Sequence, residues 1–532
     1  MGLFSPAKMA EINNIAKNCT NLVQENHHVS RGTTQKLEET SKKVREYFPD
    51  SPAILITTKE QLHDYITACI EFGTAGIDTE TTGLSMTSDT IVGMSLYVPT
   101  KAECYIPIAH KALLTDSLLP NQLTYQEVGE ELQRLVDNET KLVFANAGFD
   151  IGMIYKDCKV DLIDNFYFDV ILAWRCLKED EKDNKLKSLY AKYVLKHSTN
   201  MTQFTDFFDV ALFPYCNPDV ARLYAANDPK ITYELYKFEL PYVTKTHPKC
   251  IKHHLESIAD LVWNIEFKLV PICIKMSRQG VYLDDSTATT LHERYVSRKK
   301  ESVAKLQSMV QDVIEANRSR VNMAKAPFRS GAEYNYNSSP QTIYLLYTLM
   351  GLSNPEPNSK LNASKETLKL LNNPMSKQIL EVRAIDKALG TFIDKLPKMT
   401  TTDGNIHATF HSIGADTGRF SSSDPNMQQI PSHMTDIRHM FRATPGYVML
   451  SSDYSAQEPK LTAYISGDEG YIAELKAGKD PYAVLATKIY NLPYEQCLEF
   501  NPVTGAKQPE GKARRSSAKI LQLGRRMLCP AA

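Results

Sequence analysis

The sequence predicts several domains: an α/β domain, then a helix-rich region, then a mixed α+β segment. Three observations support this prediction. The length of 532 residues corresponds to roughly three to four domains of ~150 residues. Short β-branched runs bounded by turn residues cluster between residues 53 and 147, and helical periodicity dominates from about 241 to 400. Strand-like runs return after residue 400.

The composition excludes several classes of protein. Apolar residues make up 42% and charged residues 23%, as in soluble globular proteins, which excludes a wholly disordered or collagen-like chain. The 61 Lys and Arg nearly balance the 62 Asp and Glu, so the chain is not basic throughout. No run approaches the ~18 apolar residues that span a bilayer, so we expect no membrane association. Ten scattered cysteines without a C-x-x-C pair fit buried, reduced thiols in a cytoplasmic protein.

We expect four regions. Residues 1–52 are polar and lysine-rich and predict a peripheral arm that ends at "YFPDSP". Residues 53–240 contain the strand-like runs "AILITT", "AGIDTE", "TIVGMSLYV" and "KLVFANA" together with helical patterns, which predicts an α/β domain. Residues 241–400 are helix-rich. Residues 401–532 contain the strand-like runs "GNIHATFHSIG" and "GYVMLSSDYS".

A basic stretch lies in the helix-rich region. Residues 294–329 contain nine Lys and Arg against three Asp and Glu. Two interpretations remain open, a solvated helix face and a surface that contacts phosphates. The nearly neutral net charge of the chain therefore does not exclude nucleic-acid binding, because binding depends on the local charge of the surface.

Acidic residues recur at the predicted ends of strands and helices in residues 53–240. "GIDTETTGL" places Asp78 and Glu80 two apart on a predicted strand, so both carboxylates point to one face. Two carboxylates this close repel each other unless a divalent cation neutralises them. "LVFANAGFD" places Asn146 after a strand and Asp150 at a helix start, where a helix cap is the alternative role for Asp150.

A tyrosine and an aspartate complete the pattern. "RLYAANDPKITYELY" predicts Tyr224 and Asp228 on one helix face, four residues apart. A buried core tyrosine beside a surface aspartate is the alternative. The ordered motifs D-x-E, N-x-x-x-D and Y-x-x-x-D resemble those of proofreading 3′→5′ exonucleases of the DnaQ-like group, which have an RNase H-like fold.

The resemblance implies functional roles for these residues. Asp78, Glu80, Asp150 and Asp228 would hold two Mg²⁺ or Mn²⁺ ions, Tyr224 would position the attacking water, and Asn146 would support the site. The implied substrate is the 3′ end of single-stranded DNA.

Later motifs resemble family A DNA polymerases. "IEFKLVPICIKMSRQGVYLD" and "YNYNSSPQTIYLLYTLMGL" resemble the thumb, and "TGRFSSSDPNMQQIP" resembles the first palm motif. The resemblance implies that Arg419, Asn426 and Gln428 contact the DNA primer-template. The fold would then be an RNase H-like exonuclease domain, a helical thumb, and an incomplete palm and fingers.

Two further motifs imply nucleotide binding. In "LSSDYSAQEPK", Asp453 follows the predicted strand "YVMLSS" and would bind Mg²⁺ with the incoming dNTP, and Glu458 would shape the sugar pocket. In "KARRSSAKILQLG", Arg515 and Lys519 share a helical face and would bind the triphosphate. A solvated basic helix start is the alternative for this last pair.

The sequence departs from the family pattern after Gly524. The family continues with a tyrosine–glycine pair and later a second palm aspartate in a His-Asp-Glu motif, whereas this sequence reads "RRMLCPAA". We therefore expect an N-terminal portion of a polymerase, with a complete exonuclease set and an incomplete polymerase set. A frameshift, an unspliced intron, a split gene and decay all remain open.

The sequence thus predicts a portion of a family A polymerase with 3′→5′ exonuclease activity. Its motif "DYSAQEPK" resembles that of bacteriophage polymerases. Two alternatives remain. One is a split enzyme that polymerises only with a C-terminal polymerase fragment as partner. The other is a non-catalytic DNA-binding remnant.

Overall fold

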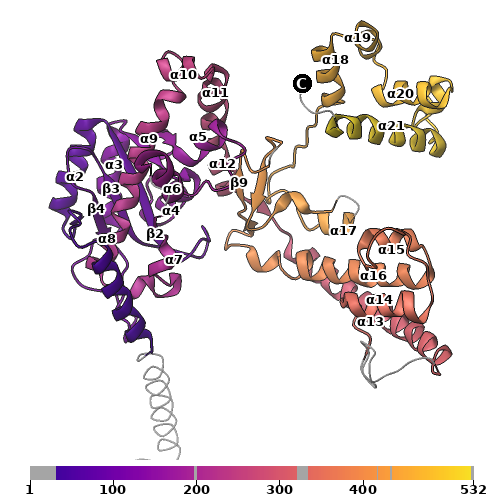
Figure 1. Cartoon of the computed structure of the whole chain (residues 1–532), viewed down its shortest axis with the longest axis horizontal. Helices are drawn as coiled ribbons and strands as arrows, with labels where there is room; N and C mark the ends of the chain where they lie inside the picture. The colour runs from indigo at the N-terminus through magenta and orange to yellow at the C-terminus, as the bar shows by residue number, and fades with distance from the viewer. Residues whose placement is uncertain (1–31, 197–200, 320–332, 416, 432–433, 529–532) are drawn as a thin grey trace, which may run out of the picture. The chain divides into compact units, whose positions relative to one another are not determined.

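The computed structural model describes residues 32–196, 201–319, 333–415, 417–431 and 434–528. The chain divides into two compact units, Met1–Gly446 and Tyr447–Ala532 (Figure 1). Each unit is described separately below. Our expected boundaries at 52/53, 240/241 and 400/401 lie within the first unit and stay predictions.

A six-stranded mixed sheet organises the first part of unit 1. Its strands are β1 (Ile54–Leu55), β2 (Thr74–Thr81), β3 (Ile91–Tyr97), β4 (Cys104–Pro107), β5 (Lys141–Phe144) and β6 (Phe166–Asp169). The spatial order is β1-β4-β3-β2-β5-β6, so β2 lies near the centre. Strands β2, β3 and β4 pair antiparallel, whereas β5 and β6 extend the sheet in parallel from β2. The four strands predicted from the sequence are confirmed, and β4 and β6 are additional.

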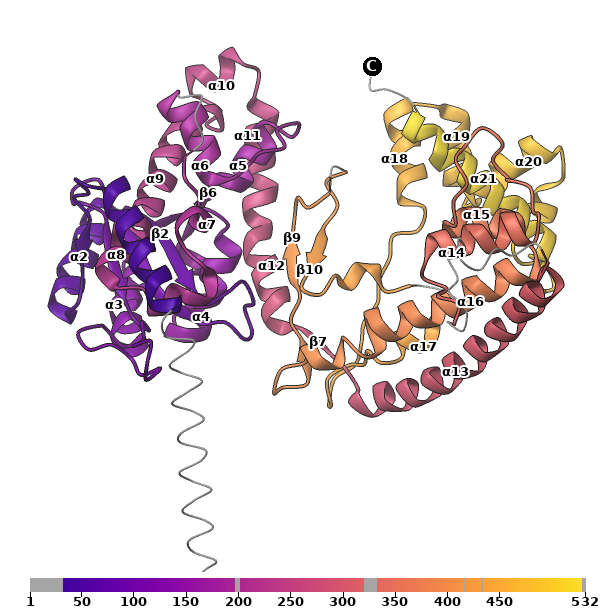
Figure 2. The same ribbon diagram turned by 60° about the horizontal axis from the view of Figure 1, so that its bottom comes forward.

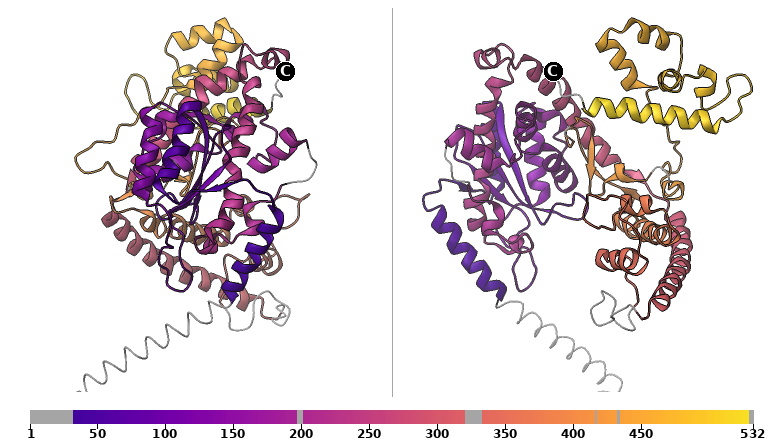
Figure 3. Two further views of the ribbon diagram at one scale, coloured as in Figure 1. Left: turned by 90° about the vertical axis from the view of Figure 1, so that its left-hand side faces the viewer. Right: turned by 45° about the vertical axis from the view of Figure 1, so that its right-hand side comes forward.

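Helices cover both faces of this sheet, as Figure 3 shows. The helices of this part of the chain are α2 (Lys59–Phe72), α3 (Tyr125–Asp137), α4 (Ala147–Cys158), α5 (Val170–Leu177), α6 (Leu186–Leu189), α7 (Phe204–Phe207), α8 (Pro218–Ala225), α9 (Asn227–Glu239), α10 (Pro248–Lys252) and α11 (Glu256–Leu261). One face packs against α2, α3 and α4 through a core that includes Ile66, Ile77 and Leu132. The opposite face packs against α5, α8 and α9. Such burial of apolar side chains on both faces is the main stabilising contribution to this α/β layer.

The predicted peripheral arm is partly a structured element. Residues 32–47 form a helix, and Val44 within it is fully buried in one core cluster with Phe208 and Tyr224. The hydroxyl of Thr40 also donates to the backbone oxygen of Phe207. Residues 32–48 therefore contain a helix that docks through Val44, and the N-terminal arm at residues 1–52 stays a prediction. Residues 1–31 lie outside the described residues.

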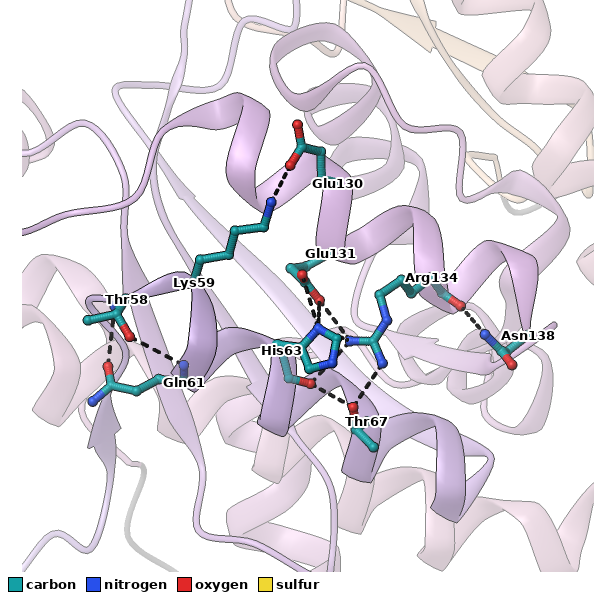
Figure 4. A network of polar contacts seen from close by, with 9 residues as sticks. All are labelled: Thr58, Lys59, Gln61, His63, Thr67, Glu130, Glu131, Arg134 and Asn138. Atoms are coloured by element: carbon teal, nitrogen blue, oxygen red, sulfur yellow. Dashed lines mark hydrogen bonds and ion pairs between the residues drawn. The ribbon is translucent and has the colours of Figure 1, made fainter.

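A charged network joins α2 to α3 on the surface (Figure 4). Arg134 donates to Glu131 (2.7 Å) and to the hydroxyl of Thr67 (2.8 Å), and Nδ1 of His63 lies 3.0 Å from the Arg134 guanidinium. The Glu131 side chain is only 6% exposed. Because a buried carboxylate needs compensating donors, this network fixes how the two helices pack.

The rest of unit 1 is mostly helical. Its helices are α12 (Phe267–Gln279), α13 (Asp285–Ala316), α14 (Ser339–Ile343), α15 (Lys365–Leu371), α16 (Pro374–Ala388) and α17 (Thr435–Arg438). The long helix α13 packs along α16, as Figure 2 shows. Two small sheets pair β7 (Val281–Tyr282) with β8 (Asn405–Ile406), and β9 (Thr409–His411) with β10 (Ser421–Ser423).

Among its described residues, unit 2 contains helices, loops and an isolated β-bridge between Phe500 and Lys507. The helices are α18 (Gln457–Ser466), α19 (Glu469–Lys476), α20 (Pro481–Tyr490) and α21 (Pro509–Leu528). The strand expected at "YVMLSS" is absent from the described part of this unit, and Tyr447, Val448 and Leu450 are 77%, 92% and 91% exposed. The prediction of a strand from the pattern "YVMLSS" was therefore wrong, because a strand forms only where a neighbouring strand pairs with it.

Two expectations from composition can be checked across the described ranges. Eight cysteines are described, and all are buried with free thiols, as predicted for small apolar side chains. Cys19 and Cys529 lie outside the described residues. Within those same ranges, the structure contains no helix of the length and apolarity that a bilayer requires.

Candidate functional site

The central strand β2 presents two of the predicted carboxylates. Side chains alternate along a strand, so Asp78 and Glu80 point to the face opposite Ile77, where α9 packs. Asp78, Glu80 and Asp228 bring carboxylate oxygens within 4.8 Å of one another. The prediction that the D-x-E pair lies on one face is confirmed, and its tertiary partner is the aspartate of α9.

Two helices, rather than one, carry the tyrosine and the aspartate. Helix α8 ends at Ala225 and α9 begins at Asn227, with Ala226 between them in right-handed helical geometry. The single helix expected from the sequence is therefore interrupted at this point. Gly76 of β2 lies against the backbone of Pro229, where a Cβ at Gly76 would overlap the Pro229 carbonyl oxygen. This close approach brings the start of α9, with Asp228, next to β2.

Asp150 lies on α4, the helix that follows β5. It is 3% exposed and is not a helix cap, because Asn146 occupies the N-cap position. Its Oδ1 accepts hydrogen bonds from the backbone N–H of Thr79 (3.1 Å) and from the Thr79 hydroxyl (2.6 Å). Thr79 lies between Asp78 and Glu80 on β2, so Asp150 is attached to the strand that carries the other acids. It lies outside the 4.8 Å group of three carboxylates.

Asn146 forms the turn between β5 and α4. Its backbone is left-handed (φ 78°), a conformation that asparagine tolerates better than most residues. The buried carboxylate of Asp169 accepts from the N–H of Ala147 (2.8 Å) and from the first turn of α5, which holds this turn in place. The exposed Asn146 side chain lines a cavity of about 360 Å³ together with Asp169 and Arg175.

The carboxylates of this site resist ionisation together. Burial and the neighbouring Asp150 and Asp228 raise the pKa of Asp78 well above its usual range. Burial and Asp228 raise the pKa of Glu80 to about 8. Burial raises the pKa of Asp150 to about 7, against the two hydrogen bonds from Thr79. Such mutual repulsion in a buried site is what a divalent cation relieves.

Lys187 is a site residue that the sequence analysis missed. Its ammonium nitrogen lies 2.9 Å from Oδ1 of Asp228, donates to the hydroxyl of Tyr224 and lies 3.7 Å from the centre of the Tyr224 ring. The residue is 6% exposed. The available signal was its place in "KLKSLYA", where Lys187 and the apolar Ala191 lie four residues apart and so fall on one face of a helical segment.

Tyr224 is a buried core tyrosine, but its neighbour Asp228 is not a surface aspartate, and the water-positioning role of Tyr224 stays a prediction. Its ring is buried among Phe48, Phe204 and Phe208, and its hydroxyl oxygen accepts from Lys187. The burial raises the pKa of the Tyr224 phenol, so its own proton is retained and remains available for donation.

The residues expected to contact primer-template DNA lie around the β9–β10 hairpin of unit 1. Arg419, Asn426 and Gln428 are all exposed. The Asn426 side chain accepts from the N–H of Gln428 (3.1 Å), and the Gln428 amide donates to the Phe420 carbonyl (2.9 Å). Arg419 lies before β10, and Asn426 and Gln428 lie after it, so the bond from Gln428 to Phe420 joins the two segments.

Salt bridges reduce the charge of the basic helix α13. Arg298 pairs with Glu381 of α16 (3.0 Å), and Arg294 pairs with Asp436 of α17. Lys299 pairs with Asp386. Part of the charge of this basic stretch is therefore neutralised within the protein, an arrangement that no local pattern indicates.

Unit 2 carries the expected nucleotide-binding residues. Asp453 and Glu458 are exposed, and Asp453 lies in an irregular segment instead of at a strand end. Arg515 binds Asp480 through two guanidinium nitrogens (2.9 and 2.8 Å). The cationic groups of Arg515 and Lys519 lie 5.3 and 5.5 Å from the Tyr482 ring centre, so they share one face of α21 as predicted.

Two segments of the chain match known families. Residues 53–238 match a family described as 3′-5′ exonuclease, and residues 300–501 match DNA polymerase family A. The first segment contains every carboxylate of the metal-binding candidate. The second contains the hairpin residues and Asp453.

The chain is also similar to curated bacterial proteins. It is 27% identical over 439 residues to the DNA polymerase I of Pseudomonas aeruginosa, covering 79% of this chain and 43% of that protein. It is 27% identical over 460 residues to the DNA polymerase I of Chloroflexus aurantiacus, covering 83% and 44%. The thermostable DNA polymerase I of Thermus aquaticus is 30% identical over 254 residues, 45% of this chain and 28% of that protein. The chain spans less than half the length of these relatives.

A solved structure shares the fold. It is the POL domain of Pol1 from M. smegmatis in complex with DNA primer-template and dNTP, with a TM-score of 0.60 and 18% identity. The match covers 87% of this chain and 70% of that one. The chain is thus similar to the 3′-5′ exonuclease family through residues 53–238 and to DNA polymerase family A through residues 300–501.

Proposed function

We propose that this chain is a 3′→5′ exonuclease that removes nucleotides from the 3′ ends of single-stranded or frayed DNA. The observation that carries the proposal is the convergence of Asp78, Glu80 and Asp228 within 4.8 Å at the centre of the sheet. Carboxylate oxygens are hard ligands that suit Mg²⁺ or Mn²⁺. Oδ1 of Asp228 lies 2.9 Å from the Lys187 ammonium, a partner that a divalent cation would replace.

The protein residues would divide the work. Asp78, Glu80 and Asp228 would hold two divalent cations, with Asp150 as the fourth carboxylate, kept in place by Thr79. When bound, the cations supply activation of the attacking water and stabilisation of the leaving 3′ oxygen. Tyr224 would orient that water through its hydroxyl proton, because its oxygen is already occupied by Lys187. Asn146 would support the site from the turn that begins α4.

Degradation of a 3′-labelled single strand in Mg²⁺ tests this proposal. Asp78→Ala should abolish the activity, and EDTA should abolish that of the unaltered chain. Asp137→Ala removes an exposed carboxylate on α3, outside the centre, and should retain full activity. Degradation that persists in Asp78→Ala would overturn the assignment.

We propose primer-template binding as the function of the second family segment. Arg419, Asn426 and Gln428 would contact the duplex, as their exposure and the bond that joins Gln428 to Phe420 allow. In unit 2, Asp453 would bind Mg²⁺ with the dNTP, Glu458 would shape the sugar pocket, and Arg515 and Lys519 would bind the triphosphate. Tyr482 holds the last two on one face of α21.

A specific observation favours a partner-dependent polymerase over a self-sufficient one. Val448 and Leu450 are more than nine-tenths exposed in a segment with a strand-like sequence. We propose that this segment pairs with a strand supplied by a C-terminal polymerase fragment. Primer extension should then require that fragment and be lost in Asp453→Ala. Robust extension by the 532-residue chain alone would refute this, and DNA binding without extension in either case would favour a non-catalytic remnant. Bacteriophage origin and action in the host cytoplasm stay predictions from the sequence alone.

A further inference from the structure

Lys187 occupies an unusual position for a lysine. Its ammonium lies among the carboxylates of the candidate metal centre, 2.9 Å from Asp228, and the side chain is 7% exposed. A buried ammonium is unfavourable unless charges or dipoles compensate it. Asp228 and the hydroxyl and ring of Tyr224 supply that compensation. The lysine is therefore held in the centre by the same groups that would serve catalysis.

The Lys187 ammonium and a metal ion would compete for the same carboxylate, that of Asp228. Asp228 is one of three carboxylates whose oxygens converge, and the ammonium faces that same side chain. An ammonium is a compact point charge on a flexible four-carbon stem, so it is able to leave Asp228 without any movement of its helix. The helix itself is anchored by the buried Leu189 and Ala191.

We propose that Lys187 is the resident cation of this centre: its ammonium neutralises Asp228 when no divalent ion is bound, and contacts the phosphodiester of the DNA end when ions are bound. This inference rests on the proposed exonuclease function. It assigns a substrate-contacting role to a residue outside the carboxylate–tyrosine motif.

Charge balance supports the contact between the Lys187 ammonium and the phosphodiester when ions are bound. The four negative charges of Asp78, Glu80, Asp150 and Asp228 match two divalent cations, which leaves the single negative charge of a phosphodiester uncompensated. The positive charge of the Lys187 ammonium balances the negative charge of the phosphodiester. In a buried site such an imbalance is expensive, because interactions between charges are strong where water is excluded.

Tyr224 contacts the Lys187 ammonium at Asp228 and would still contact it at the phosphodiester. Its hydroxyl oxygen accepts from Lys187 while the ammonium faces Asp228, and its ring lies against the same ammonium. A short swing of the ammonium along this ring preserves the contact with the aromatic face, which attracts cations. Lys187 therefore also acts as a positioning residue for the Tyr224 hydroxyl.

Binding experiments without turnover test the inference. Lys187→Met keeps the side-chain length and removes the charge. In the full chain without DNA, calorimetric titration with Mn²⁺ should give at least about tenfold tighter binding for Lys187→Met, because Mn²⁺ no longer competes with the ammonium for Asp228. In Ca²⁺, the affinity for a 3′-ended single-stranded oligonucleotide should fall about tenfold, because a charge-assisted contact is lost. Lys187→Arg should restore the DNA affinity, and Lys185→Met, at an exposed position on the same segment, should change neither quantity.

The outcomes separate this inference from the proposed function. Unchanged or weaker Mn²⁺ binding in Lys187→Met would overturn the claim that the ammonium neutralises Asp228 in the absence of ions. Unchanged DNA affinity would overturn the claim that it contacts the phosphodiester. Lys187→Gln provides the same two measurements if the Met variant does not fold. If the unaltered chain degrades no DNA yet Lys187→Met binds Mn²⁺ more tightly, the exonuclease proposal fails while the resident-cation role stands.

Discussion

Thr79 donates two hydrogen bonds to one oxygen of Asp150, from its backbone N–H at 3.1 Å and from its hydroxyl at 2.6 Å. Thr79 lies between Asp78 and Glu80 on β2, with its side chain on the opposite face of the strand. The three consecutive residues Asp78, Thr79 and Glu80 therefore all serve one site. Asp78 and Glu80 contribute carboxylates, and Thr79 holds the carboxylate that comes from α4.

Thr79→Val should destabilise the metal-free chain by about 1.5 kcal/mol, because a hydrogen bond to a buried carboxylate is lost while the shape is kept. The exonuclease rate should fall as well, since Asp150 loses one of its two restraints. Both tryptophans, Trp174 and Trp263, lie in unit 1, so urea unfolding followed by tryptophan fluorescence reports on this unit. Ser95→Ala is the matched control. The Ser95 hydroxyl is buried without a hydrogen-bond partner in the described residues, so its removal should change stability little.

The metal-free chain should lose stability as pH rises from about 5 to about 8. Glu80 and Asp150 have pKa values of about 8 and about 7 in the folded chain, whereas unfolded carboxyls titrate near ~4. Over this interval the folded state retains protons that the unfolded state releases, so the free energy of unfolding falls as pH increases. Urea unfolding in EDTA at several pH values measures this. Saturating Mn²⁺ should remove most of the fall, and Glu80→Gln should reduce it. Stability that rises over this interval in EDTA would contradict the burial of these groups.

Gly76→Ala should impair both folding and the exonuclease. A Cβ at this position overlaps the carbonyl oxygen of Pro229, so the start of α9, with Asp228, must move. Overpacking of this kind destabilises by about 1–3 kcal/mol. We expect a matching loss of Mn²⁺ affinity in calorimetry.

Gly148→Ala is the control for this glycine substitution. Gly148 lies within α4 with no atom within 4 Å of an added Cβ, so alanine should stabilise the helix by roughly 0.5–1 kcal/mol. Equal destabilisation by the two substitutions would show that the contact with Pro229 is unimportant.

The network between α2 and α3 predicts unequal effects for two ion pairs. Arg134→Ala leaves Glu131, 6% exposed, without its main cationic partner, which should destabilise unit 1 by about 3 kcal/mol. Lys59→Ala breaks the exposed pair with Glu130 and should cost less than about 1 kcal/mol. Tryptophan-monitored urea unfolding of the two variants compares them directly. Similar losses would contradict the importance of burial in this network.

Several parts of the fold follow from local sequence because their physics is local. The alternation of β2 predicts that Asp78 and Glu80 share a face, and the structure confirms it. The run "KLVFANA" likewise predicts β5, with its asparagine, Asn146, directly after the strand. The predicted strand at "YVMLSS" was wrong because a strand depends on a distant partner that the pattern of one segment does not reveal.

The sequence by itself determined the strands and helices that carry the acidic motifs, the shared face of Asp78 and Glu80, and the resemblance to family A polymerases. Only the tertiary structure decided that Lys187 lies against Asp228, that Thr79 holds Asp150, and that acidic residues of α16 and α17 neutralise part of α13. The reason is physical. Periodicity specifies the direction of a side chain relative to its own helix or strand, whereas these contacts depend on which distant element packs against that face.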